Sequence, residues 1–346
     1  MRPVNSLYRF MKYVVFTLFL IGIVVVSANL IINQNAVVPP HIELQETNLS
    51  IPAPVHTFPF EQVIITVTSP VDPSVYVGAK VADKETLIRG NVSEDVWLET
   101  TYLSMINDPD QKQFYTDLIG NLRGIRNERG LNDDEYLELI AVFVQSVRYE
   151  TTSESPPKFP IETYVDKSGD CDDKSLLLAG LLSREEYNVS LLSFTPESHM
   201  AVGVVCPDAE YRQTGYTFIE TTHLSFVGVP TEKLREGVTL YSDPQVIRVG
   251  NGTKTFGSCK ESLYMDFVIK ISETSVEDLS TQIDSLKTEM DGYYIQRDAE
   301  NYNQHVPLYN DLQHQRRQYA ELHNYILNHQ YDRKGTYQYV KNNIPR

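Results

Sequence analysis

Cysteine is scarce in this chain of 346 residues, which contains three: Cys171, Cys206 and Cys259. Three are too few for a disulfide-stapled framework, and an odd number leaves at least one thiol free. None of them forms a CxxC motif and the eight histidines are scattered, so we expect no zinc site and no other cofactor. Cys171 is the natural candidate for the free thiol. Cys206 and Cys259 either pair outside the cytoplasm or remain as two buried thiols.

Basic residues are also few relative to acidic ones. The chain has 30 lysines and arginines against 46 aspartates and glutamates, a formal net charge of −16. Because nucleic-acid phosphates would be repelled by such a surface, this charge argues against a nucleic-acid partner. Apolar residues make up 41% and charged residues 22%, which is typical of a globular protein with one ordinary core and accessory segments.

One long apolar run stands out, from Tyr13 to Ile32, and the basic residues Arg2, Arg9 and Lys12 precede it. Twenty helical residues span about 30 Å, the thickness of a bilayer core. The run therefore predicts a single transmembrane helix with its amino terminus in the cytoplasm. A cleavable signal peptide is the alternative, because residues 26–28 (Val-Ser-Ala) suit a cleavage site. Either interpretation puts the rest of the chain outside the cytoplasm.

The most informative stretch is the sequence SGDCDDKS at residues 168–175, which runs into the leucine-rich residues 176–182. This pattern places Cys171 at the amino end of a buried helix. Unpaired N–H groups and the positive end of the helix dipole favour a thiolate there, whereas a free thiol has a pKa of about 8.5. The neighbouring carboxylates oppose a thiolate unless they cap the helix or pair with Lys174.

A histidine and a carboxylate follow this cysteine in an order that suits nucleophilic catalysis. His199 opens a strand-like run that ends at Val205, and Glu220 ends the next such run. A thiol, an imidazole and a carboxylate are the parts of a nucleophile, its base and the group that orients the base. His223 is a competing base, which we disfavour because it lies beyond the end of the strand that carries Glu220.

This order resembles the transglutaminase-like superfamily, which has a papain-like core, and suggests a membrane-anchored prokaryotic-type member. The resemblance covers about residues 95–250, and includes the helix at residues 136–149 that ends in tyrosine. It implies an α+β fold with Cys171 as nucleophile, His199 as base and Glu220 as third member. The family usually has aspartate in an Asp-Pro-Thr context where this chain has Glu220 followed by two threonines.

The resemblance further implies acyl transfer through a cysteine thioester. An oxyanion hole would use the backbone N–H of Cys171, with the Tyr164 side chain as a candidate second donor. Water resolves the thioester in a peptidase or amidase, which we favour, and an amine resolves it in a cross-linking enzyme. The substrate would be a protein or peptide-like molecule outside the cytoplasm. A catalytically silent binding or assembly module on the same fold is the alternative.

The sequence predicts four segments. They are a cytoplasmic tip and anchor at 1–33, an extended stalk with a lead-in strand at 34–94, the catalytic domain at 95–260 and a helical hairpin at 272–346. In the last segment apolar residues recur in steps of three and four, as in a coiled-coil seam. We expect its two helices to be joined between Asn301 and Val306, with Pro307 at the start of the second. The hairpin would pack on itself, on the catalytic domain or on a second copy of the chain.

Overall fold

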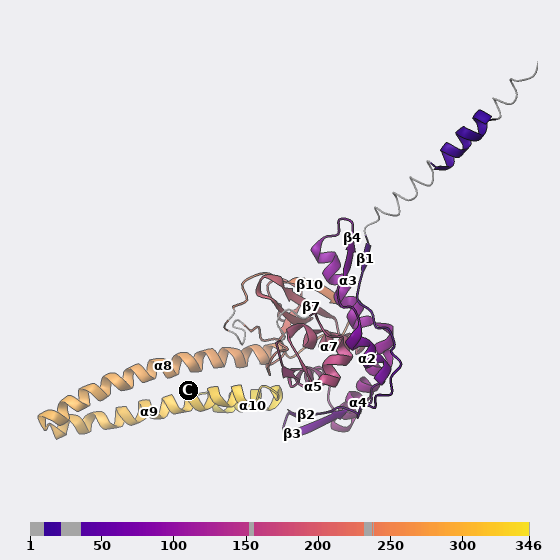
Figure 1. Cartoon of the computed structure of the whole chain (residues 1–346). Coiled ribbons are helices and arrows are strands. Elements are labelled where there is room, and N and C mark those ends of the chain that lie inside the picture. Colours follow the sequence, from indigo (N-terminus) through magenta and orange to yellow (C-terminus); the bar gives the residue numbers. More distant parts are fainter. Residues whose placement is uncertain (1–9, 22–35, 152–155, 232–236, 238, 346) are drawn as a thin grey trace, which may run out of the picture. The chain divides into compact units, whose positions relative to one another are not determined.

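The computed structural model describes residues 10–21, 36–151, 156–231, 237 and 239–345. Helices and small sheets make up the fold, which is α+β as predicted (Figure 1). The chain divides into two compact units: residues 1–41 with 83–105, and residues 42–82 with 106–346.

The smaller unit contains a two-stranded sheet and a helix. Strand β1 (Ala36–Val38) pairs antiparallel with β4 (Leu87–Arg89), and most of helix α3 (Glu94–Asn107) belongs to the same unit. The hydroxyls of Thr86 and Thr101 lie 2.6 Å apart and join the start of β4 to α3. Acidic residues in the first turn of α3 suit the positive end of its dipole.

The prediction of a transmembrane helix from Tyr13 to Ile32 is wrong. Among the residues that the structure describes, no helix is long and apolar enough to cross a membrane. A helix covers residues 10–21. Residues 22–32 of the predicted span lie outside the described residues.

The larger unit is built on a four-stranded antiparallel sheet in the order β10-β7-β8-β9. Its strands are β7 (Val189–Phe194), β8 (His199–Val204), β9 (Thr217–Ile219) and β10 (Gln245–Val249). Every residue of β7 and β8 is buried, which explains their nearly continuous apolar sequences. Helix α7 (Cys171–Arg184) packs on β7 and β8, so the predicted cysteine helix lies against the predicted histidine strand.

Helix α5 (Asp133–Gln145) packs against α7 and is buried along nearly its whole length. A reciprocal capping box between Asn132 and Glu135 fixes its start. The preceding helix α4 (Lys112–Arg129) ends at Gly130, which has the left-handed conformation that favours glycine (φ 65°). Shorter elements complete this part of the chain: η1 (Pro109–Gln111), β5 (Arg148–Tyr149), α6 (Pro160–Asp166), β6 (Ser168–Gly169) and η2 (Thr195–Glu197).

Part of the segment predicted as an extended stalk belongs to the larger unit. Strands β2 (Val55–Phe60) and β3 (Val63–Thr68) form a hairpin, and helix α2 (Pro73–Val81) follows. Phe58 and Phe60 are buried, and the ring of Phe58 lies 5.7 Å from that of Phe143 in α5. The segment therefore differs from the expectation, because its alternating apolar side chains are buried in the core that carries α7.

Two long helices, α8 (Cys259–Gln296) and α9 (Ala299–Asn328), run side by side as an antiparallel hairpin (Figure 1). Helix α10 (Arg333–Asn343) follows. The turn lies at Arg297 and Asp298, earlier in the chain than predicted, because Arg297 adopts a left-handed conformation and Asp298 caps α9. The predicted seam is buried between the helices by Leu279, Ile283, Leu286, Met290 and Leu312. Pro307 lies inside α9 rather than at its start.

A disulfide joins Cys206, two residues beyond the end of β8, to Cys259, the first residue of α8. The closed loop spans 53 residues, and the chain-entropy account gives such a loop a stabilisation of about 4 kcal/mol. The pairing also identifies Cys171 as the free cysteine.

A buried ion cluster attaches the base of the hairpin to the core. Arg333 at the start of α10 donates to Glu138 in α5 at 2.5 Å and also to Glu261 in α8. Next to it, Lys334 donates to Glu135 at 2.7 Å. Because Arg333 and Glu138 are both buried, each depends on the other for compensation of its charge.

Removing the buried arginine should therefore be costly. We expect Arg333→Ala to lower the free energy of unfolding by about 3–5 kcal/mol, because Glu138 is left buried without its partner. The exposed Arg317 in α9 is the matched control, and Arg317→Ala should change it by less than about 0.5 kcal/mol. Urea unfolding of the two variants measures the difference, and equal midpoints would contradict the prediction.

Candidate active site

The start of α7 is fixed by carboxylates that cap its backbone. Asp170 accepts from the N–H of Asp173 at 3.2 Å, and Asp173 accepts from the N–H of Asp170 at 3.3 Å and from that of Lys158 at 2.6 Å. Gly169 permits this close approach, because a Cβ there would lie 2.6 Å from the Asp173 Cβ. Two of the three neighbouring carboxylates thus act on backbone groups, which fixes the position of Cys171 as the first residue of the helix.

The Cys171 thiol is buried and contacts the backbone of Ser198 and Met200, the two residues that flank His199. Its Sγ is 3.8 Å from the backbone oxygen of Ser198 and accepts a hydrogen bond from the N–H of Met200. It is also 3.4 Å from Oδ1 of Asp172, to which the thiol can donate. Two contacts on either side of His199 place the sulfur next to the first residue of β8, as the order of residues predicted.

His199 and Glu220 form a buried pair, with 3.3 Å between Nε2 and Oε2. The other oxygen of Glu220 accepts from the N–H groups of Thr221 and Thr222 and from the Thr222 hydroxyl, at 2.8 to 2.9 Å. Burial acts to raise the pKa of Glu220, but His199 and Thr222 outweigh it and lower the pKa to about 2. Glu220 is therefore an ionised carboxylate beside the imidazole, in the place where the family resemblance implies aspartate.

Hydrogen bonds to the backbone around Glu220 connect the His199–Glu220 pair to helices α5 and α7. Gln145, the last residue of α5, donates from its side-chain amide to the backbone oxygens of Glu220 at 2.8 Å and Ser225 at 3.0 Å. Its own backbone oxygen accepts from the buried ammonium group of Lys174 in α7 at 3.0 Å. Lys174 thus pairs with backbone oxygens at and just beyond the end of α5.

The resting thiol is held in its protonated form. Burial raises the pKa of Cys171 above that of a free thiol, and the carboxylates of Asp172 and Asp170 raise it further. The hydrogen bond from Met200 acts in the opposite direction but does not compensate. The expectation of a thiolate, which rests on the helix start and an imidazolium neighbour, therefore does not describe this state.

Asp172 is a site residue that the sequence interpretation treated only as a helix-start carboxylate. Burial and then the charge of Asp170 raise its pKa to about 6, while contact with the Cys171 thiol and the charge of His199 act to lower it. Its carboxylate thus belongs to the same cluster as the thiol and the imidazole. The signal available in the sequence was its position directly after the nucleophile.

Tyr164 is placed away from the thiol. Its hydroxyl accepts from the N–H of Ser69 at 2.7 Å and lies 3.3 Å from the backbone oxygen of Pro54, and its ring stacks on His56. This placement does not support Tyr164 as a donor to an oxyanion. The N–H of Cys171 remains suitable, because the first amide of a helix has no acceptor within that helix.

His223, the competing base, lies against Thr222, with 3.1 Å between its Nδ1 and the threonine hydroxyl. That hydroxyl also donates to one oxygen of Glu220, whereas His199 lies 3.3 Å from the other oxygen of this carboxylate. The geometry brings together Cys171, His199 and Glu220, and favours His199 as the base.

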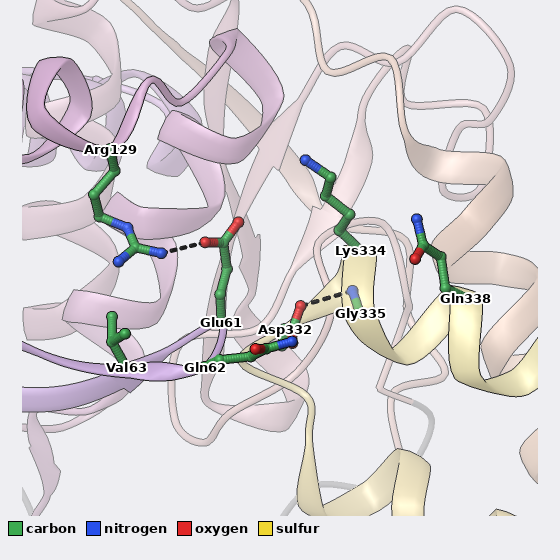
Figure 2. Close-up of a pocket in the computed structure, with 8 residues that line it drawn as sticks. All are labelled: Glu61, Gln62, Val63, Arg129, Asp332, Lys334, Gly335 and Gln338. Carbon is green, nitrogen blue, oxygen red and sulfur yellow. Dashed lines mark hydrogen bonds and ion pairs between the residues drawn. The ribbon is translucent and has the colours of Figure 1, made fainter.

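A cavity of about 360 Å³ lies elsewhere in the larger unit, between the β2–β3 turn, the end of α4 and the start of α10 (Figure 2). In it Arg129 points toward Glu61, with which it forms an ion pair, and Asp332 accepts from the N–H of Gly335. Charged side chains in this cavity are paired, and it contains none of the three triad residues. In the described part of the chain, no group of three or more His, Cys, Asp or Glu side chains is arranged to hold a metal ion.

Comparison with models of known protein families, with curated proteins and with solved structures found no match. Interpretation of the site therefore depends on its own residues: a buried thiol, an imidazole beside it and an ionised carboxylate behind the imidazole.

The contact between Asp172 and the thiol can be tested directly. Asp172→Asn removes a negative charge that raises the pKa of Cys171, so the thiolate fraction at pH 7 should increase, by about tenfold for each unit by which that pKa falls. We expect faster alkylation of Cys171 by iodoacetamide, measured by mass spectrometry.

Asp291→Asn in the exposed face of α8 is the control and should react at the wild-type rate. A rate that falls in Asp172→Asn would contradict the prediction.

Proposed function

We propose that this chain is a thiol-dependent acyl-transfer enzyme of transglutaminase-like type that acts on peptide or amide bonds. The observation that carries the proposal is the buried arrangement of Cys171, His199 and Glu220, in which Nε2 of the imidazole faces an ionised carboxylate. An ionised partner fixes the tautomer of a histidine and stabilises its imidazolium form, as in other triads.

The reaction would begin with transfer of the thiol proton to Nδ1 of His199, because Nε2 is directed to Glu220. The Cys171 sulfur then attacks the substrate carbonyl carbon, and the N–H of Cys171 donates to the oxygen that becomes negative. Imidazolium returns its proton to the amine as the carbon–nitrogen bond breaks, which leaves a thioester. Water, deprotonated by His199, attacks the thioester, and the acid and the free thiol are released.

Hydrolysis is the favoured outcome, as a peptidase or amidase, because it requires only water in addition to the acyl donor. An amine in place of water would form a new amide bond and make the protein a cross-linking enzyme. A silent binding module is the second candidate function. The raised pKa of Cys171 favours that candidate, because a thiol that stays protonated does not attack a carbonyl.

We further propose that the enzyme acts on a protein or peptide-like substrate outside the cytoplasm. The support is the disulfide between Cys206 and Cys259, because such bonds persist in oxidising compartments and are rare in the cytosol. The net charge of −16 is consistent with the expectation that nucleic acid is not the substrate.

Replacing the triad residues tests the proposal. The full chain is incubated with a mixture of synthetic peptides, and new products are identified by mass spectrometry. Cys171→Ala should abolish turnover, and Glu220→Gln should lower it by roughly tenfold to ten-thousandfold because the imidazolium form loses its ionised partner. Glu220→Asp should be the milder change, since it keeps the charge while shortening the reach.

Thermal melting of each variant separates lost chemistry from lost folding. If turnover persists in Cys171→Ala, the thiol is not the nucleophile. If the wild-type chain turns over no peptide and Cys171 resists iodoacetamide, the silent module is the better description.

A further inference from the structure

The loop of residues 240–243 lies at the end of the sheet where His199 begins β8. Strand β10 starts at Gln245, opposite Ser193 near the end of β7, and the last residue of β7 is opposite His199. The loop that leads into β10 therefore reaches the sheet at its active-site end. Leu240 anchors it, because this side chain is buried in a cluster with Phe194 and other core residues.

Two charged side chains hold this loop by its backbone. Glu197 accepts from the N–H of Tyr241 at 2.9 Å, and from the N–H of Ser242 at 2.7 Å and its hydroxyl at 2.6 Å. Arg212 donates to the backbone oxygens of Leu240, at 2.6 Å, and Ser242. Although burial acts to raise the pKa of Glu197, these bonds from the loop outweigh it and lower that pKa, so the carboxylate stays ionised.

Glu197 also connects the loop to the nucleophile. It is followed by Ser198, whose backbone oxygen lies 3.8 Å from the Cys171 sulfur, and then by His199. The backbone of the loop is thus tied to a residue two positions before the base. Glu197 and Arg212 thus hold four backbone groups of this loop. The side chain of Tyr241 is 72% exposed and is the aromatic surface that the loop presents.

We propose that Tyr241 is a specificity-determining residue, a fixed aromatic surface that receives an apolar side chain of the peptide acyl donor bound to Cys171. This inference rests on the proposed function and names a substrate class for it: extended peptides with an apolar residue near the bond that is cleaved. A ring held on an anchored loop loses little conformational entropy when it binds, and aromatic rings contribute large apolar contact areas. Glu197 and Arg212 act as positioning residues, which hold the ring in place.

The experiment compares two reagents on the full chain. Iodoacetamide is small and needs only the thiol, whereas an N-capped phenylalanyl-alanyl chloromethyl ketone also needs a peptide-binding surface. Tyr241→Ala should slow the reaction of the peptide reagent with Cys171 about tenfold and leave the iodoacetamide rate within about twofold. Tyr294→Ala, at a tyrosine that is 76% exposed near the hairpin turn, is the matched control and should change neither rate.

Glu197→Gln separates positioning from contact. With the ring present but its loop loosened, the peptide reagent should react more slowly than with wild type, while Tyr241→Phe should react at nearly the wild-type rate because the apolar ring is kept.

The outcomes distinguish failure of the role of Tyr241 from failure of the proposed function. If wild type reacts with the peptide reagent at Cys171 and Tyr241→Ala reacts equally fast, the role of Tyr241 is refuted and the proposed function stands. Equal slowing of both reagents in Tyr241→Ala would also refute it, since that result reports on the thiol. If wild type reacts with iodoacetamide but not with the peptide reagent, the proposed function and this inference both fail.

Discussion

A polar junction at Gln145 determines how the parts of the candidate active site are placed relative to one another. Its backbone oxygen accepts from the buried Lys174 ammonium in α7, and its side chain donates to the backbone oxygen of Glu220. The helix that carries Cys171 and the chain segment that carries Glu220 are therefore both bonded to the last residue of α5. Buried polar groups are costly when unpaired, so this junction permits few alternative arrangements of the site.

The pKa values of Glu220 and Cys171 are shifted in opposite directions. Hydrogen bonds from Thr222 and the contact with His199 keep Glu220 ionised despite its burial, whereas burial and two carboxylates keep Cys171 protonated. The resting site is thus a thiol beside an oriented imidazole rather than a preformed ion pair.

Local sequence patterns were enough to predict which residues are brought together. Contacts that depend on tertiary structure were predicted poorly. A glycine turn before a leucine run places Cys171 at the start of α7, and the apolar runs that follow place His199 at the start of β8. The contact of Asp172 with the thiol and the use of the Tyr164 hydroxyl by Ser69 depend on side-chain directions that no periodicity specifies. The predicted lead-in strand is present as β3, whereas β2 falls mostly within the predicted stalk, because the core side chains that bury this hairpin, such as Phe143, lie far along the chain.

The disulfide between Cys206 and Cys259 changes how movement travels through the larger unit. Along the chain, 53 residues separate Cys206, just beyond the end of β8, from Cys259 at the start of α8, but the disulfide joins them directly. Helix α8 is 38 residues long, so at 1.5 Å per residue it is a lever of about 57 Å with its fixed end at that bond. A force applied at the far turn of the hairpin therefore reaches the end of β8 through the disulfide as well as through the ion cluster at Arg333.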